Sequence, residues 1–429
     1  MTGFSPERLG MHLRALSEGI GVRLAGTEGE RRAAEYIAQQ FQRSGAGVTV
    51  ERFPIQARRV TEERLEVEIG GQWRAFPCSL FSSTPGTDGP REAPLVFFEA
   101  PTEYQRPDLS RLTGKAVVHL GCHIESREHY RRLMEAQPAF LLFVDIRYPG
   151  AVPLADGMFP SYTRDLGACP TVNVAFMDAW NWKVEGAARA RLMVSGGPEP
   201  AESQNVIAEL PGNGEDGGLI FLGAHHDTQA NSPGADDNAS GVAGLIELAG
   251  ALAAVPRRRA IRIISFGAEE QLSMGSAAYV RRHRAEIAER GQLMFNLDSY
   301  GSVMGWTHVV CNGAPELAST VAGAFARRDL YPAIDANIVP YADHFPFVAA
   351  GIPGMYLGRS NCAGGRFFHH RPDDDMSRVS APVMAEHLAA VADLISDAAL
   401  REVLPFPREI PEPQRVEARR YWDDLFGGW

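Results

Sequence analysis

Hydrophobic positions in the second half of the chain alternate between short apolar runs and segments with helical spacing. The predicted strands are 219–224, 260–268, 292–298, 307–312 and 354–358, and the predicted helices are 238–254, 273–289, 315–328 and 382–399. Short apolar runs separated by helices are typical of strands buried on both faces of a parallel sheet. We therefore expect an α/β domain with a mixed, mostly parallel sheet and helices on both faces.

The first half of the chain shows a different pattern of hydrophobic positions. Residues 28–43 carry helical periodicity, as do residues 5–17, and alternating strand-like segments follow. From about residue 76, prolines and short strands surround one helical segment, 125–136, which indicates an inserted β-rich module. The predicted organisation is 1–75 as the first part of the α/β domain, 76–200 as the inserted domain, 201–400 as the main part of the α/β domain and 401–429 as a C-terminal tail. The tail is expected to be either a packed arm or a loosely held segment.

Composition narrows the class of protein. The chain has 429 residues, 45% of them hydrophobic and 22% charged, which are ordinary values for globular domains. Its net charge of −11 argues against a nucleic-acid partner. The longest weakly charged stretch, 238–255, carries Glu247 and is read as a buried helix, so no membrane partner is expected. The N-terminal segment lacks a signal-peptide pattern, and five widely spaced cysteines fit reduced thiols, so a cytoplasmic location is expected.

Side chains that bind metals or transfer protons follow the apolar runs of the predicted sheet. They are His225, Asp227, Asp237, Glu269, Glu270, Asp298 and His370. Because ligands bind beyond the carboxyl ends of strands in an open parallel sheet, we expect these side chains to converge. Buried carboxylates repel one another and raise each other's pKa unless a cation neutralises them. Imidazole and carboxylate groups are suitable zinc ligands, so the pattern indicates a site for a pair of zinc ions.

Five segments carry a resemblance to a known family. GAHHDT, GADDNASGVA, FGAEEQ, NLDS and FHHRPDDD resemble, in order and spacing, the motifs of the co-catalytic dizinc aminopeptidases of the MH clan. Glutamate carboxypeptidase, the glutaminyl cyclases and the catalytically silent transferrin receptor are related to them. The resemblance covers about residues 203–399, and RLAGTEGERRAAEYI is similar to the family's opening helix. It implies a zinc-exopeptidase-like fold, and the inserted module is similar to the protease-associated domains of some relatives.

The resemblance implies a role for each matching residue. His225 and Asp298 would hold one zinc ion, Glu270 and His370 the other, and Asp237 would bridge both. Co²⁺ or Mn²⁺ suits the same ligands.

Two further residues complete the implied machinery. Glu269 would be the general base, and Asp227 would fix the tautomer of His225 through a hydrogen bond.

The oxyanion donor is left open by the motifs. We prefer His370 to His369 as the final metal ligand because RPDD follows it, matching the H-T-P-x-D form of the family. His369 then stands where several relatives have a tyrosine, and either His369 or Tyr341 is a candidate donor to the oxyanion. Asp343 and His344 are expected to be structural or to line the substrate site.

The expected function is a zinc-dependent exopeptidase, a metallo-aminopeptidase that hydrolyses N-terminal residues of peptides by a dizinc-bound hydroxide with a Glu general base. The alternatives are a carboxypeptidase, a deacylase or a glutaminyl-cyclase-like enzyme on the same scaffold, or a non-catalytic receptor-like protein. A pocket cation that recognises a free carboxylate would favour the carboxypeptidase, and Arg359, Arg366 and Arg371 are candidates for it. Peptides are the expected partners, and a homo-oligomer is left open.

Overall fold

The computed structural model describes residues 3–100, 102–124, 126–215, 217–362 and 365–429. The chain divides into two compact units, which are described separately. Unit 1 comprises Met1–Ile55, Glu202–Asp423 and Gly428–Trp429, and unit 2 comprises Gln56–Ala201 and Asp424–Gly427. Strands β1 (Gly47–Ile69) and β8 (Arg189–Leu210) and helix α12 (Glu412–Leu425) contribute residues to both units.

Unit 1 is built on a mixed sheet with the strand order β13-β12-β14-β11-β9-β10-β8. Its strands are β9 (Leu219–His225), β10 (Ala260–Phe266), β11 (Gly291–Leu297), β12 (Trp306–Asn312), β13 (Ala333–Asp335) and β14 (Gly354–Ser360), together with the last part of β8. The four central strands β14, β11, β9 and β10 are mutually parallel. Strand β8 runs antiparallel to β10, and β12 runs antiparallel to β14 but parallel to β13. The predicted fold class is confirmed.

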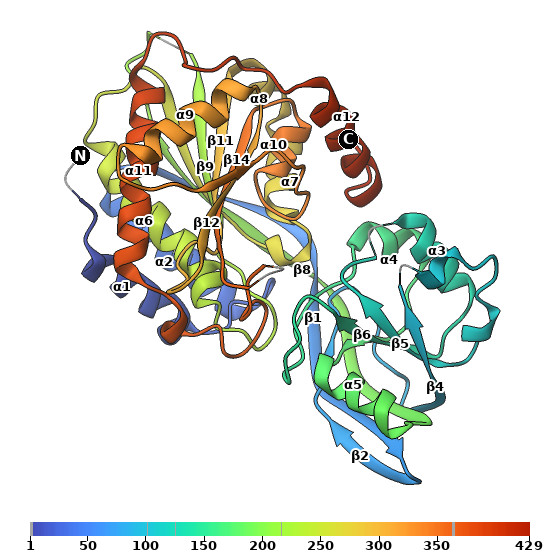
Figure 1. Cartoon of the computed structure of the whole chain (residues 1–429). Helices are drawn as coiled ribbons and strands as arrows, with labels where there is room; N and C mark the ends of the chain where they lie inside the picture. Colours follow the sequence, from blue (N-terminus) through green and yellow to red (C-terminus); the bar gives the residue numbers. More distant parts are fainter. Residues whose placement is uncertain (1–2, 101, 125, 216, 363–364) are drawn as a thin grey trace. The chain divides into compact units, whose positions relative to one another are not determined.

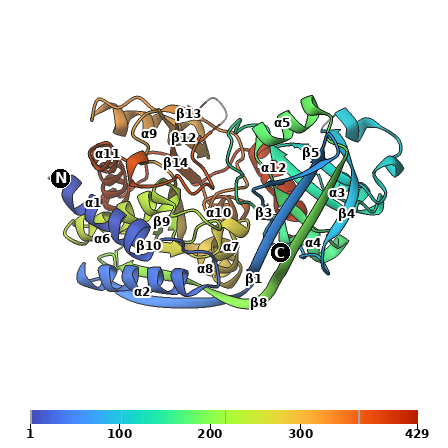
Figure 2. The same cartoon turned by 90° about the horizontal axis from the view of Figure 1, so that it is seen from below.

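Helices cover both faces of this sheet (Figures 1 and 2). Two apolar clusters join these helices to the sheet. The first contains side chains of α1 (Pro6–Arg14), α2 (Glu28–Arg43), α6 (Gly241–Ala253), α9 (Pro315–Ala326) and α11 (Ala381–Leu400). The second contains side chains of α7 (Met274–Arg282), α8 (Arg284–Arg290) and α10 (Phe345–Ala349). Side chains of a central strand alternate between the clusters: Ile220 and Leu222 of β9 belong to the first, and Leu219 and Phe221 to the second. This alternation buries both faces and explains the uninterrupted apolar runs in the sequence.

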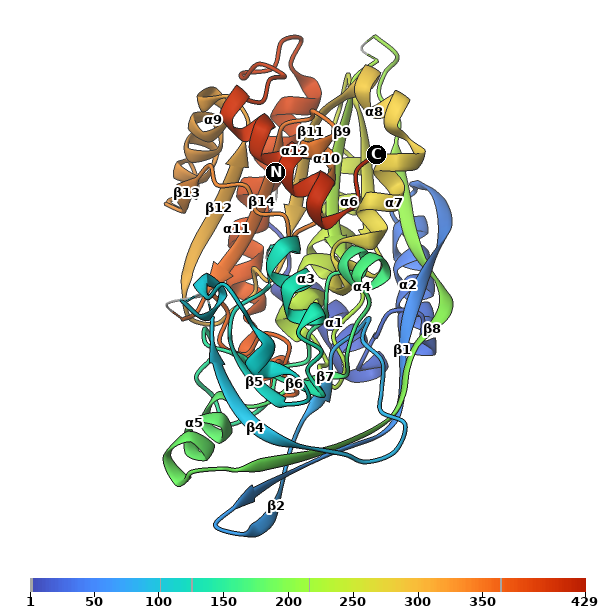
Figure 3. The same cartoon turned by 90° about the vertical axis from the view of Figure 1, so that its right-hand side faces the viewer.

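Unit 2 contains a smaller sheet with β4, β5, β6 and β7 parallel, β3 antiparallel to β7, and residues Arg189–Leu192 of β8 antiparallel to β4 (Figure 3). Its elements are β2 (Gln72–Phe76), β3 (Ser79–Leu80), β4 (Arg91–Glu99), β5 (Ala116–Gly121), α3 (Arg127–Glu135), β6 (Phe140–Asp145), α4 (Pro160–Leu166), β7 (Thr171–Asn173) and α5 (Phe176–Glu185), with short 3₁₀ turns at Thr102–Gln105 and Ser110–Leu112. Trp182 is fully buried in this core and packs edge-to-face on Phe76.

Several predicted boundaries differ from the observed ones. Unit 2 begins at Gln56, whereas the sequence suggests residue 76, because the β1–β2 hairpin belongs to this unit. Among the short strands predicted in the inserted module, the run TVNVAFM at 171–177 is a strand only as far as Asn173, since Phe176 begins α5. The predicted helix 273–289 is interrupted at His283, which has a non-helical backbone. Residue 125, the first of another predicted helix, lies outside the described residues.

The part of the C-terminal segment that belongs to unit 1 is a packed arm. Helix α12 buries Trp422, whose ring lies 4.5 Å from that of Trp429 and 6.4 Å from that of Phe345. None of the helices in the described ranges has the length and apolar character needed to cross a membrane.

Candidate metal centre

The predicted ligands lie at the carboxyl ends of the parallel strands of unit 1. His225 is the last residue of β9, Asp298 follows β11, and Glu269 and Glu270 form a 3₁₀ turn directly after β10. His370 belongs to the loop after β14. Parallel strands end at the same edge of the sheet, and this is why these side chains meet.

Asp237 lies between two pairs of donors. On one side, His225 Nε2 is 3.1 Å from Asp237 Oδ1 and 3.5 Å from Asp298 Oδ1. On the other side, His370 Nε2 is 2.8 Å from Glu270 Oε2 and 3.6 Å from Asp237 Oδ2. Donor atoms of His225, Asp237 and Glu270 all lie within 4.8 Å of one another. Asp237 therefore occupies the position from which one carboxylate can reach two ions.

The electrostatics of this cluster favour bound cations. Burial opposes charge on His225, yet Glu269 and Asp227 raise the pKa of this imidazole well above its usual value. Burial also raises the pKa of Glu269 well above its usual range, and the neighbouring carboxylates of Asp343 and Asp298 act in the same direction. Buried acidic groups at this density need positive charge nearby. Imidazole and carboxylate ligands fit zinc, so the residues present suit such an ion.

Asp227 supports the cluster from behind. Its carboxylate accepts hydrogen bonds from the backbone N–H groups of Glu269, at 2.9 Å, and Glu270, at 3.2 Å. His225 Nδ1 lies 3.2 Å from the backbone carbonyl of Asp227 and 3.6 Å from its Oδ1. The carboxylate of Asp227 thus fixes the turn that carries the two glutamates, and its backbone carbonyl is the hydrogen-bond partner of the imidazole.

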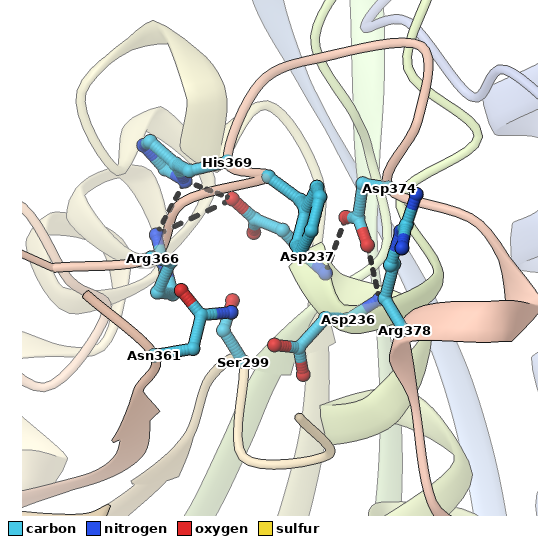
Figure 4. A pocket seen from close by; sticks show the side chains of 9 residues that line it. Asp236, Asp237, Ser299, Asn361, Arg366, His369, Asp374 and Arg378 are labelled. Atoms are coloured by element: carbon cyan, nitrogen blue, oxygen red, sulfur yellow. Dashed lines mark hydrogen bonds and ion pairs between the residues drawn. The ribbon is translucent and has the colours of Figure 1, made fainter. Parts of the chain in front are cut away.

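Asp374 has an equivalent position beneath Asp237. Its carboxylate accepts the backbone N–H groups of Asp236, at 2.9 Å, and Asp237, at 3.0 Å (Figure 4). The side chain of Asn238 then caps α6 by accepting the N–H of Gly241 at 2.7 Å. The helix predicted from residue 238 therefore begins only at Gly241, and Asp237 lies in the π-helical turn Ala235–Ser240 that precedes it. Sequence reasoning gave Asp374 no role, although it lies in the FHHRPDDD motif.

Arg23 is a second residue that sequence reasoning missed. Its side chain is fully buried and donates hydrogen bonds only to backbone carbonyls. The acceptors are Leu16, Gly21, His226, Pro233 and Gly234, at 2.7–3.2 Å. His226 adjoins His225, and Gly234 precedes the turn that carries Asp237, so one guanidinium ties together the two ends of the loop between these candidate ligands. Burial lowers the pKa of Arg23 to about 10, which leaves it charged at neutral pH.

Glu269 has a defined environment. Ser273 donates from Oγ to Glu269 Oε1 at 3.1 Å, and Glu269 Oε2 lies 3.8 Å from His225 Nε2. Asp343 accepts a hydrogen bond from Ser276 Oγ at 2.5 Å, and burial raises its pKa to about 7. Glu269 therefore borders the ligands and is held by a neutral donor.

The structure distinguishes the substrate candidates. His369 Nδ1 lies 2.7 Å from Asp237 Oδ2, and Asp237, His369 and His370 form another group of potential ligands, so His369 contacts the centre. Tyr341 is half-buried, in the segment that precedes α10. His344 Nε2 lies 3.2 Å from Asn312 Oδ1, and burial lowers its pKa to about 3. His344 is thus a buried, neutral side chain that contacts Asn312 and stacks on Tyr356.

A mixed sheet with imidazoles and carboxylates at the carboxyl ends of its parallel strands is an arrangement suited to metal-dependent hydrolysis. Residues 205–395 match the model of peptidase family M28, and together with the aminopeptidase relatives this match supports a metal-dependent hydrolase.

Similar proteins agree with this assignment. Aminopeptidase YwaD of Bacillus subtilis is 27% identical over 425 residues, which cover 96% of this chain and 88% of YwaD. BSAP, a zinc aminopeptidase from Bacillus subtilis, has a TM-score of 0.76 at 23% identity, covering 96% of this chain and 99% of BSAP. A Peptidase M28 precursor from Shewanella amazonensis has a TM-score of 0.77 at 20% identity, covering 95% and 98%. These two structures share the fold.

Proposed function

We propose that the chain is a dizinc aminopeptidase that removes N-terminal residues from peptides. The observation that carries this proposal is the position of Asp237 between the pair His225 and Asp298 and the pair Glu270 and His370. The name of the relative that matches nearly the whole chain, aminopeptidase YwaD, supports the same reaction.

Bound in this cluster, zinc supplies Lewis-acid chemistry, which polarises the peptide carbonyl and acidifies water. His225 and Asp298 would hold one ion, Glu270 and His370 the other, and Asp237 both. Excess carboxylate charge in the cluster would also receive the free α-ammonium group of the substrate, which favours an exopeptidase that acts at the N-terminus.

Glu269 is the proton carrier of the proposed reaction. Burial raises its pKa well above the usual range for glutamate, and a raised pKa suits a group that must both accept and release a proton near neutral pH. Glu269 takes a proton from the attacking water and returns it to the leaving amine. His369, beside Asp237, is the better placed of the two candidate donors to the oxyanion, because its contact with the cluster is direct.

The alternative reactions have less support. A carboxypeptidase, a deacylase or a cyclase would use the same scaffold, but YwaD, which matches nearly the whole chain, is an aminopeptidase. A receptor-like protein has no need of a complete ligand set, and here every predicted ligand reaches the cluster.

Hydrolysis of leucine p-nitroanilide by the full chain loaded with zinc tests the proposal. We expect turnover that a chelator abolishes and zinc restores, and no turnover of the N-acetylated substrate. Glu269→Gln should lower kcat by about 10²–10⁴ while zinc content stays unchanged. Glu289→Gln, the same substitution at an exposed position of α8, is the control. Full activity of Glu269→Gln with zinc bound would contradict the assigned base.

A further inference from the structure

The turn that carries Glu269 and Glu270 has an uncommon backbone conformation. Ala268, which precedes the two glutamates, has a φ of 50°, and Leu272 and Ser273, which follow them, have φ values of 67° and 48°. Positive φ is unfavourable for residues that have a side chain, so such a turn persists only where the surrounding contacts hold it.

Side-chain oxygen atoms bind four successive backbone N–H groups of this turn. Asn205 Oδ1 accepts the N–H of Gly267 at 3.2 Å, and the carboxylate of Glu30 accepts the N–H of Ala268. The two oxygen atoms of Asp227 accept the N–H groups of the two glutamates. The turn is thus held by side chains from three other segments of the chain, β8, α2 and the loop after β9.

Glu30 is the acceptor that lies farthest from the turn in the sequence. It belongs to the first turn of α2 and is 1% exposed. Gly26 donates its backbone N–H to Glu30 Oε2 at 2.7 Å, and Ser203 Oγ donates to Glu30 Oε1 at 2.5 Å. Burial raises the pKa of Glu30 to about 8, and its hydrogen bonds oppose this rise. One of its three donors, the N–H of Ala268, belongs to the residue directly before Glu269.

Glu30 and Ser203 pack directly against the backbone of the turn. A Cβ atom at Gly267 would lie 2.8 Å from Glu30 Oε1 and 2.3 Å from Ser203 Oγ, so a glycine is needed there. Asn205 holds the other side of the turn, because its Nδ2 also donates to the carbonyl of Gly275 at 2.9 Å. Helix α2 and strand β8 therefore determine the position of the turn.

We propose that Glu30 is a positioning residue for the proposed general base, a role that rests on the proposed aminopeptidase function. By binding the N–H of Ala268, Glu30 fixes the peptide unit from which Glu269 presents its carboxylate to the metal cluster. Asp227 binds the next two N–H groups, so two buried carboxylates hold three consecutive residues. A proton carrier must lie within hydrogen-bond reach of the attacking water, and a small displacement slows the reaction more than it weakens substrate binding.

Steady-state kinetics of the zinc-loaded full chain test this role. At saturating zinc and below the unfolding transition, Glu30→Ala should lower kcat for leucine p-nitroanilide about 10–100-fold and leave KM within about threefold of wild type. Glu30→Gln keeps one oxygen that can accept an N–H, so it should recover part of kcat. Glu35→Ala, at an exposed position of the same helix, is the matched control and should behave like wild type.

Ile37→Ala separates positioning from stability. Ile37 is fully buried in α2 and belongs to the first apolar cluster, so its truncation destabilises the same helix without removing a hydrogen bond from the turn. A merely structural role of Glu30 predicts that folded Glu30→Ala and folded Ile37→Ala have the same kcat. Positioning predicts a lower kcat in Glu30→Ala alone.

Hydrogen–deuterium exchange of the zinc-loaded chain gives a readout that needs no turnover. Peptides that cover residues 267–270 should exchange about tenfold faster in Glu30→Ala than in Ile37→Ala, whereas peptides of β9 should exchange alike. If Glu30→Ala does not fold, Glu30→Gln takes its place and should show smaller changes in the same direction.

The outcomes separate this inference from the proposed function. Wild-type kcat in the Glu30 variants, or wild-type exchange at the turn, overturns the positioning role and leaves the aminopeptidase intact. If the wild-type chain hydrolyses no substrate, the proposed function fails and exchange alone decides: faster exchange in Glu30→Ala supports the contact with the turn, and equal exchange overturns it.

Discussion

Replacing Arg23 with methionine tests whether its guanidinium group fixes the loop between His225 and Asp237. The side chain is fully buried, and its five acceptors are backbone carbonyls of the N-terminal segment and of the loops after β9. Methionine fills similar space but donates no hydrogen bond, so these carbonyls would lose a partner. We expect unit 1 to unfold more easily and zinc to bind more weakly.

The size of the effect follows from these contacts. A buried acceptor left without a donor costs about 1–3 kcal/mol, and the costs within one network do not add. Removing one partner of a buried charged network typically costs about 3–5 kcal/mol. We therefore expect Arg23→Met to lower the free energy of unfolding by about 4 kcal/mol. Arg23→Lys keeps the charge but supplies fewer donors in a different geometry, so its loss should be about half as large.

Differential scanning calorimetry with excess zinc and with a chelator measures both effects. Arg32→Met is the matched control, since this arginine is exposed and makes one 3.3 Å contact to the carbonyl of Gly19. Because zinc binds the folded chain, weaker affinity reduces the stabilisation that zinc adds. The reasoning is refuted if Arg23→Met and Arg32→Met unfold within about 1 kcal/mol of each other and gain equally from zinc.

Three further outcomes are expected. Asp374→Asn should weaken zinc affinity by about 10–100-fold, measured in competition with a chromophoric chelator, because an amide has only one oxygen with which to accept the two backbone N–H groups. Asp373→Asn is the control, and equal zinc affinities of the two variants would show that Asp374 does not hold Asp237 in place. Burial lowers the pKa of His119 to about 4, whereas its pKa in the unfolded chain is near 6.5. Below pH 6.5 the unfolded chain therefore takes up a proton that the folded chain does not. The free energy of unfolding of unit 2 should be unaffected by His119 above pH 6.5 and should fall by about 3 kcal/mol as the pH is lowered to 4. In urea titrations His119→Phe should flatten that dependence, and an unchanged slope would exclude His119 as its cause. Trp422→Ala should destabilise unit 1 by about 3–5 kcal/mol in thermal unfolding, whereas Trp180→Ala, at a site 58% exposed, should change little.

The strands of unit 1 and its candidate ligands could be predicted because both follow from local patterns. Uninterrupted apolar runs mark strands with two buried faces, and the residue after such a run lies at the carboxyl edge of the sheet. This reasoning brought His225, Glu270 and Asp298 together without knowledge of the intervening loops.

The supporting contacts could not be predicted, because they join side chains to distant backbone. Arg23 binds carbonyls up to 211 residues away, and carbonyls have no sequence signature. Asp374 binds N–H groups in the same way across 137 and 138 residues. The late start of α6 has a similar cause, since the side chain of Asn238 takes the place of a helical turn.

Zinc stoichiometry with the positions of the ions tests the central claim most directly. Anomalous diffraction at the zinc edge, on crystals of the full chain grown with zinc, should show two ions about 3.5–4 Å apart, one on each side of Asp237. Asp237→Asn should weaken the binding of both ions. A single ion, or two ions that do not share Asp237, would contradict the account.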